Sequence, residues 1–122
     1  MAISQYKNSY DLLQKDLKNR ILLLDGAMGT MIQQKNLTAD DFGGEKYEGC
    51  NDYLVLTKPE IIKNIHKKYL KAGSDIIETN SFGALDIVLK DYDLEDRAFE
   101  MNKKAAELVN ETILEYRSEN PS

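Results

Sequence analysis

A short, unbroken run of aliphatic residues constrains the fold of this chain more than any other feature. The run "ILLL" covers residues 21–24, ends on Asp25 and is followed at once by the glycine-bearing stretch 26–30. Such a short apolar run is typical of a strand that is covered on both faces, as the strands of parallel sheets are. An Asp-Gly step at the end of a strand is either an ordinary turn or the floor of a binding site.

The middle of the chain predicts a helix and then a second strand. Thr57 is placed to cap the helix, and Glu60 stands at the reciprocal position of a capping box. Apolar residues recur at helical spacing up to Gly73, which suits the left-handed position at a helix end. The stretch "SDIIET", residues 74–79, then predicts a second short buried strand. Together these segments predict a strand–helix–strand unit.

Further helices flank this unit. Helical spacing of apolar residues predicts a leading helix over about residues 9–18, a short helix over 28–34 and a long amphipathic helix, packed on a sheet, over 94–116. Strands that alternate with helices pair in parallel through right-handed crossovers. We therefore expect an α/β fold, with residues 1–122 as one unit without an internal domain boundary. Because two strands keep free edges, we expect this unit to be part of something larger.

Three other features can be explained by structure alone, without a functional role. The stretch 36–53 is polar and aperiodic, and it is longer than the roughly 12–15 residues beyond which structureless loops are uncommon. It is therefore either a functional loop or solvated decoration. His66 lies among lysines and is expected on a solvated helix face. Cys50, the single cysteine, has no partner and is expected to be a bystander.

The composition excludes several classes of protein. The net charge of −5 argues against nucleic-acid binding, which depends on basic surface. No apolar run approaches the roughly 18–20 residues of a membrane span, and the first ten residues lack the apolar segment of a signal peptide. One cysteine and one histidine provide neither a disulfide framework nor a local zinc motif. We therefore expect a cytoplasmic protein that does not bind membranes and holds no metal of its own.

The candidate site lies at the carboxyl ends of the two predicted strands, where parallel α/β folds bind their ligands. A carboxylate beside the free amides that precede a helix suits a zwitterion, with the ammonium on Asp25 and the carboxylate on the amides. The sequence thus predicts an amino-acid site, and plain turn chemistry is the alternative. The candidate substrate-binding residues are Asp25, Gly26, Ala27, Met28 and Gly29 after the first strand, and Thr79, Asn80 and Ser81 after the second. No catalytic residue is assigned.

Two longer stretches carry a family resemblance. They read "RILLLDGAMGTMIQ" and "GCNDYLVLTKPEIIKNIHKKYLKAGSDIIETNSFGA" and begin at Arg20 and Gly49. Together with the helix that follows, they resemble the homocysteine-binding (S-methyltransferase) module of cobalamin-dependent methionine synthase. The resemblance runs from about Leu12 to Tyr116, nearly the whole chain. Methyltransferases that use betaine or S-methylmethionine share the "DG" opening, but the exit "ETNSF" is closer to methionine synthase.

The resemblance implies a (β/α)8 TIM barrel that binds homocysteine at the carboxyl ends of its strands. In that family three cysteines from late strands hold a zinc ion, which lowers the pKa of the homocysteine thiol, and methylcobalamin on another module donates the methyl group. This chain corresponds to the leading helix and the first two βα units, a partial barrel that is incomplete on its own. Asp25 would take the ammonium, the amides of 26–29 the carboxylate, and residues 79–81 would line the neighbouring wall. The zinc cysteines lie outside it, so we expect no cofactor here and no activity of the chain alone.

Two other interpretations remain open. "LLLDGAMGT" superficially resembles the motif of haloacid dehalogenase-type phosphatases, but Ala27 stands where those enzymes need a second carboxylate. A non-catalytic interpretation is a truncated α/β module that associates with itself, or with the remainder of the barrel, through open sheet edges.

Overall fold

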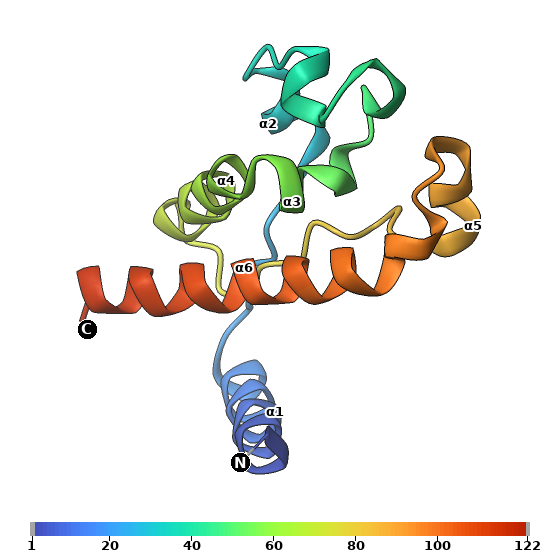
Figure 1. Ribbon diagram of the computed structural model, residues 1–122. Helices are drawn as coiled ribbons and strands as arrows, with labels where there is room; N and C mark the ends of the chain where they lie inside the picture. Colours follow the sequence, from blue (N-terminus) through green and yellow to red (C-terminus); the bar gives the residue numbers. More distant parts are fainter. Residues whose placement is uncertain (1, 122) are drawn as a thin grey trace.

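The fold is almost entirely helical. The computed structural model describes residues 2–121, with side chains from Asn8 onward. Within that range six α-helices and five short 3-10 helices account for most of the chain (Figure 1). The α-helices are α1 (Ala2–Asn19), α2 (Gly29–Gln33), α3 (Leu54–Thr57), α4 (Pro59–Ala72), α5 (Asp86–Leu89) and α6 (Ala98–Glu119). The 3-10 helices are η1 (Ala39–Phe42), η2 (Glu45–Tyr47), η3 (Asn51–Tyr53), η4 (Lys90–Tyr92) and η5 (Glu95–Arg97).

The predicted α/β fold, and with it the partial (β/α)8 barrel, is wrong for this chain: the described residues form no sheet. The two segments expected to be strands meet only at one isolated bridge, between Leu24 and Ile76, which has the parallel sense. The backbone amide of Leu23 donates to the side chain of Asp75 at 3.0 Å. In a sheet, this amide would donate to a backbone carbonyl of the neighbouring strand. A pair of strands without a third is at most marginally stable, so the segments remain extended without forming a ladder.

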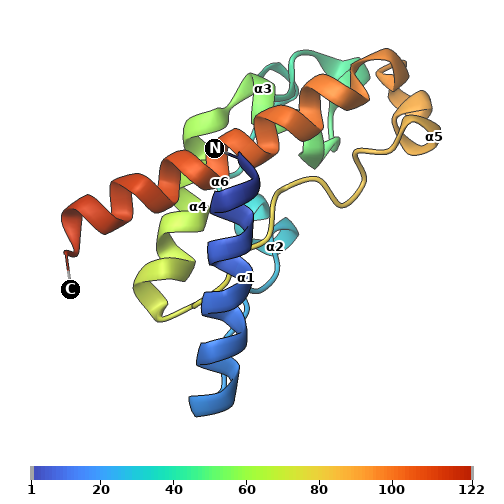
Figure 2. The same cartoon turned by 90° about the horizontal axis from the view of Figure 1, so that it is seen from below.

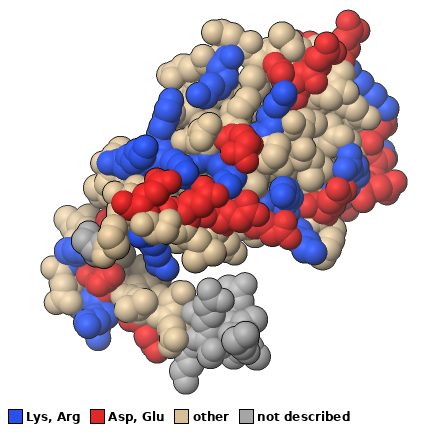
Figure 3. All heavy atoms as spheres, turned by 60° about the vertical axis from the view of Figure 1, so that its left-hand side comes forward, with Lys and Arg blue, Asp and Glu red and all other residues tan. Residues whose placement is uncertain are grey.

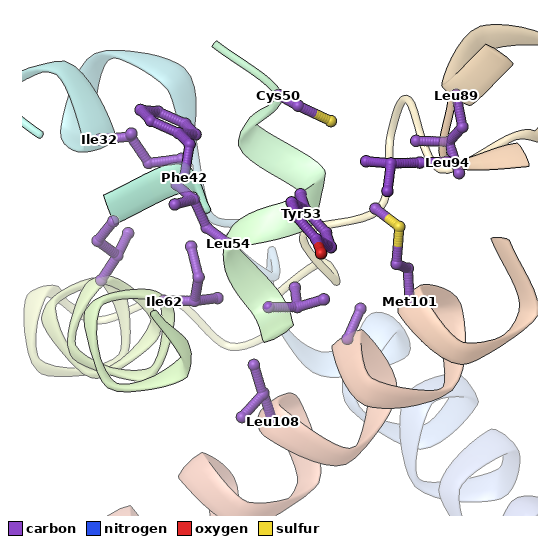
Figure 4. Packing of buried hydrophobic residues seen from close by; sticks show 13 residues of the cluster. Ile32, Phe42, Cys50, Tyr53, Leu54, Ile62, Leu89, Leu94, Met101 and Leu108 are labelled. Atoms are coloured by element: carbon purple, nitrogen blue, oxygen red, sulfur yellow. The ribbon is translucent and has the colours of Figure 1, made fainter. Parts of the chain in front are cut away.

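The core lies between helices rather than between helices and a sheet. α6 packs against α4 and α3, and in both views these elements lie side by side (Figures 1 and 2). The apolar face predicted for the long helix is confirmed, since Met101, Ala105 and Leu108 are buried. Its predicted partner, a sheet, is replaced by helices. Figure 4 shows the side chains of these elements converging around Leu54 and Tyr53.

The stretch 36–53 is neither structureless nor solvated decoration. It forms η1, η2 and η3. η1 begins with a capping box, in which the side chains of Thr38 and Asp41 each accept the other's backbone amide. Phe42, Cys50 and Tyr53 are buried in the core (Figure 4). This largely polar stretch therefore contributes three residues to the core: Phe42 from η1, Tyr53 from η3 and Cys50 from the position just before η3.

The predicted start of α4 differs from the observed one, whereas its predicted end is confirmed. Thr57 belongs to α3 and does not cap α4, because the chain is already helical up to that residue. Gly73 ends the helix in the left-handed conformation, with φ of 109°. His66 is fully buried, so its expected place on a solvated face is wrong. The physical reason is that α4 packs against both α3 and α6, so helices withdraw this residue from the solvent.

The predicted leading helix is confirmed, and it is longer than expected. α1 lies on the opposite side of α6 from α3 and α4 (Figure 1). Tyr10, Leu12 and Leu17 are exposed along it. The described part of α1 therefore adds little to the core.

Candidate functional site

Asp25 joins the two extended segments at their ends. Its backbone amide donates to the carbonyl of Ile76 at 2.9 Å, and its Oδ2 accepts the amide of Glu78 at 3.0 Å. Its other oxygen, Oδ1, is buried and has no hydrogen-bond partner. Buried carboxylate oxygens are rarely left without a donor, so Oδ1 is an acceptor that a water or a ligand would satisfy.

The loop after Asp25 is held from beneath by α4. The hydroxyl of Tyr69 donates to the carbonyl of Ala27 at 2.6 Å. A Cβ atom on Gly26 would lie 3.3 Å from that hydroxyl oxygen, so a larger residue would push the tyrosine away. The glycine of the Asp-Gly step thus permits a close approach between this loop and α4.

A pocket of about 380 Å³ lies beside this loop. It is lined by Ala27, Met28, Gly29, Asn51, Asp52, Asn80, Phe82 and Gly83. The structure therefore brings Ala27, Met28 and Gly29 together with Asn80, as the sequence led us to expect of residues that follow the two segments.

The remaining residues predicted for the site do not line this pocket. Asp25 and Gly26 lie on the segment that leads into it. The hydroxyls of Thr79 and Ser81 bond each other at 2.6 Å, at the start of the opposite loop. These four residues therefore support the pocket's walls in this structure rather than forming them.

The stretch 51–52 forms a wall that sequence reasoning missed. The side-chain amide of Asn80 donates to the backbone carbonyl of Asn51 at 3.0 Å. The amide of Gly83 donates to Oδ1 of Asp52 at 3.1 Å. The only signal for this wall was two short polar residues, Asn51 and Asp52, directly before the apolar run 53–56, a pattern that ordinary turns share.

Asp52 determines the electrostatics of the pocket. It is the one ionisable side chain among the lining residues, and burial raises the pKa of its carboxyl. A Cβ atom on Gly83 would lie 2.7 Å from Oδ2 of Asp52, so any larger residue would clash with this oxygen in its present position. Three other lining residues are apolar, namely Ala27, Met28 and a fully exposed Phe82. A small ligand with both a polar and an apolar part would match this lining.

The described residues do not fit the zinc ion that the family resemblance implies. Among residues 2–121, no three cysteine, histidine or acidic side chains lie close enough together to hold a metal. Cys50 is buried, and burial raises the pKa of its thiol, which disfavours the thiolate that zinc requires. No chemical step of this chain is therefore assigned to zinc. In the same range, no helix has the length and apolarity needed to cross a bilayer.

Comparison with known protein families gives a match over most of the chain. Residues 22–121 match the family described as Homocysteine S-methyltransferase. The matched range contains the first extended segment from Leu22 onward, the whole of the second, α2 to α6 and every residue that lines the pocket.

Proposed function

Because the chain belongs to the homocysteine S-methyltransferase family, we propose that the pocket beside the Asp25 loop binds homocysteine. The observation that carries this proposal is the convergence of the loop 27–29 with Asn80 in one small pocket. Homocysteine has an ammonium, a carboxylate and a short apolar side chain that ends in a thiol. The apolar lining residues Ala27 and Met28 suit the methylene groups of this side chain.

In this proposal Asp25 takes part through Oδ1, the oxygen that has no partner. An ammonium at this oxygen would satisfy the orphaned acceptor. The backbone of residues 26–29 receives the carboxylate, with Tyr69 fixing the loop by its bond to the Ala27 carbonyl. Thr79, Asn80 and Ser81 form and support the facing wall.

The reaction that we propose for the complete enzyme is the methylation of homocysteine to methionine. The thiol loses its proton, the sulfur forms a bond to the methyl carbon, and the bond between that carbon and the donor breaks. The exit "ETNSF" of residues 78–82 favours methylcobalamin as the donor over betaine or S-methylmethionine. Since the described residues do not fit zinc, this chain contributes substrate binding, and thiol activation depends on residues elsewhere. The chain alone is expected to transfer no methyl group.

A titration followed by NMR tests the binding proposal. When L-homocysteine is added to the ¹⁵N-labelled chain, we expect weak binding that shifts the amides of residues 26–29 and 80. Asp25→Asn keeps the shape of the side chain and removes its charge, so it should weaken binding. Asp91→Asn, an exposed acid on η4, is the matched control and should leave binding unchanged. If the wild-type chain shows no shift at these amides, the proposed function is wrong.

A further inference from the structure

The first extended segment has a free backbone edge. Inside the chain, the amide of Ile76 donates to the carbonyl of Leu23 at 3.1 Å, and the amide of Asp25 donates to the carbonyl of Ile76 at 2.9 Å. Successive residues of an extended segment direct their backbone groups to opposite sides. The backbone groups of Leu22 and Leu24 therefore face away from the second segment, and they have no hydrogen bond to another described residue. We call these two residues the first edge.

The second extended segment has a free edge on its far side. Because Ile76 bonds the first segment, the backbone groups of Ile77 face the other way, and they too have no hydrogen bond to another described residue. Glu78 turns back to the first segment, where its amide donates to the side chain of Asp25 at 3.0 Å. An extended residue with an unpaired amide and carbonyl is a template for another strand. We call Ile77 the second edge.

The surfaces beside the two edges are complementary. Aliphatic side chains project into the solvent along the first segment, where Ile21 is 86% and Leu24 is 61% exposed. Beside the second edge lies a groove of about 430 Å³, and its apolar lining residues include Leu70, Ile77 and Ile113. Two first edges that faced each other would leave this groove empty, whereas a first edge against a second edge would fill it with apolar side chains.

We infer that the first edge of one copy of this chain pairs, in the parallel sense, with the second edge of another copy. In this register the amide of Ile77 donates to the carbonyl of Leu22 of the other copy, and the amide of Leu24 of that copy donates to the carbonyl of Ile77. These bonds repeat the pair that Ile76 makes inside the chain, shifted by one residue on each segment. The partner is a second copy because the chain itself contains both complementary edges.

This pairing joins two different surfaces, so each copy of a pair keeps one edge free. Contacts of this head-to-tail kind build rings or open chains instead of stopping at a dimer. Because the pairing is parallel, the loop after Asp25 in one copy and the loop 78–83 in its neighbour lie at the same end of the shared strands. The assembly therefore lines up the candidate pockets of neighbouring copies along one side.

Two proline variants of the full chain test the pairing. Proline removes a backbone donor and is tolerated on a free strand edge. Leu24→Pro removes the amide of the first edge, and Ile77→Pro removes the amide of the second. We expect each variant alone to stay monomeric in analytical ultracentrifugation at concentrations at which the wild-type chain associates. Mixed in equal amounts, the two variants should form a dimer and nothing larger, because each supplies the intact edge that the other lacks.

Leu85→Pro is the matched control. Leu85 is exposed and extended, lies outside both edges, and its amide has no hydrogen bond to another described residue. This variant should associate as the wild-type chain does. Circular dichroism of the three variants checks that their helices are kept.

Hydrogen exchange on the wild-type chain tests the register without any substitution. The amides of Leu24 and Ile77 should exchange more slowly as the concentration rises. The amides of Leu23 and Asp25 are already bonded inside the chain, so their exchange should change less. The inference is overturned if the wild-type chain stays monomeric, if Leu24 and Ile77 gain no protection, or if Ile77→Pro alone still dimerises, since identical first edges would then pair with each other.

Discussion

His66 is a single residue whose burial has a measurable consequence. It is fully buried on α4, and neither ring nitrogen has a hydrogen-bond partner. Burial lowers its pKa from 6.5 to about 4, because the charged imidazolium would lose its hydration. The imidazole is therefore neutral in the folded chain at neutral pH, and it acts as a polar residue placed among apolar ones.

This burial predicts a dependence of stability on pH. The unfolded chain binds a proton at His66 below about pH 6.5, whereas the folded chain binds it only below about pH 4. Above pH 6.5 the protonation of His66 therefore does not reduce the free energy of unfolding. As the pH drops from 6.5 to 4, that free energy should fall by up to about 3 kcal/mol, because only the unfolded chain takes up the proton. His66→Leu should flatten this part of the profile and leave stability at pH 7 unchanged or higher, since it removes two unsatisfied nitrogens.

Urea denaturation at pH 7 and at pH 5 measures the effect. Asn64→Leu, at an exposed position of the same helix, controls for the added leucine and should keep the wild-type pH dependence. An unchanged pH dependence in His66→Leu would show that another group is responsible for the proton uptake.

At the scale of elements, α4 and α6 are joined by charges as well as by apolar packing. The amine of Lys63 lies 2.6 Å from Glu115 and 3.4 Å from Glu111. The amine of Lys67 lies 3.0 Å from Glu115 and 3.5 Å from Glu119. Figure 3 shows basic and acidic side chains in adjacent bands on this side of the molecule. The partners sit at steps of four along α6, so the network follows one face of each helix.

The two sides of this network should respond differently to substitution. Lys63 is buried, and the hydrogen bond to Glu115 raises the pKa of its amine, whereas Glu115 is about half exposed. Lys63→Met keeps the buried stem and leaves Glu115 in water beside Lys67, so the free energy of unfolding should change by less than about 1 kcal/mol. Glu115→Gln leaves a buried ammonium without its nearest partner and should be the more destabilising of the two.

Thermal unfolding at low and high salt tests this ranking. Lys103→Met, at an exposed position of α6, is the matched control and should be nearly neutral. If Lys63→Met were more destabilising than Glu115→Gln, the buried charge itself would be the stabilising feature.

At the scale of the whole molecule, large apolar side chains remain on the surface. Ile21 is 86% exposed on the first extended segment, Phe82 is fully exposed at the pocket, and Phe99 is 83% exposed at the start of α6. Apolar surface of this kind is typical of proteins that associate. We therefore propose that copies of this chain associate with one another at high concentration.

Light scattering over a range of concentrations measures the association. We expect the mass to rise with concentration, and Ile21→Lys to reduce the rise, because a charge on the extended segment opposes apolar contact and strand pairing. Gln33→Lys adds the same charge at an exposed polar position of α2 and should have little effect. A chain that stays monomeric throughout would contradict the proposal.

Part of the site and part of the fold could be predicted from the sequence. Short-range patterns carry their own information, and so the leading helix, the end of α4 at Gly73 and the buried face of α6 were predicted correctly. The same patterns placed Ala27 to Gly29 and Asn80 after two extended segments, and the structure brings these residues into one pocket. The wall at Asp52 was not predicted, because no periodicity or spacing connects it to the residues that it faces.

The sequence by itself determined the three long helices, α1, α4 and α6, because glycines and apolar periodicity act over a few residues. It also carries the family match over residues 22–121. Tertiary structure decided what those elements pack against. A strand exists only with a partner over several residues, and the segments 21–25 and 75–79 share one bridge, so no sheet forms. The burial of His66 and the hydrogen bond from Gly83 to Asp52 likewise depend on segments far apart in the chain, which only the folded arrangement brings together.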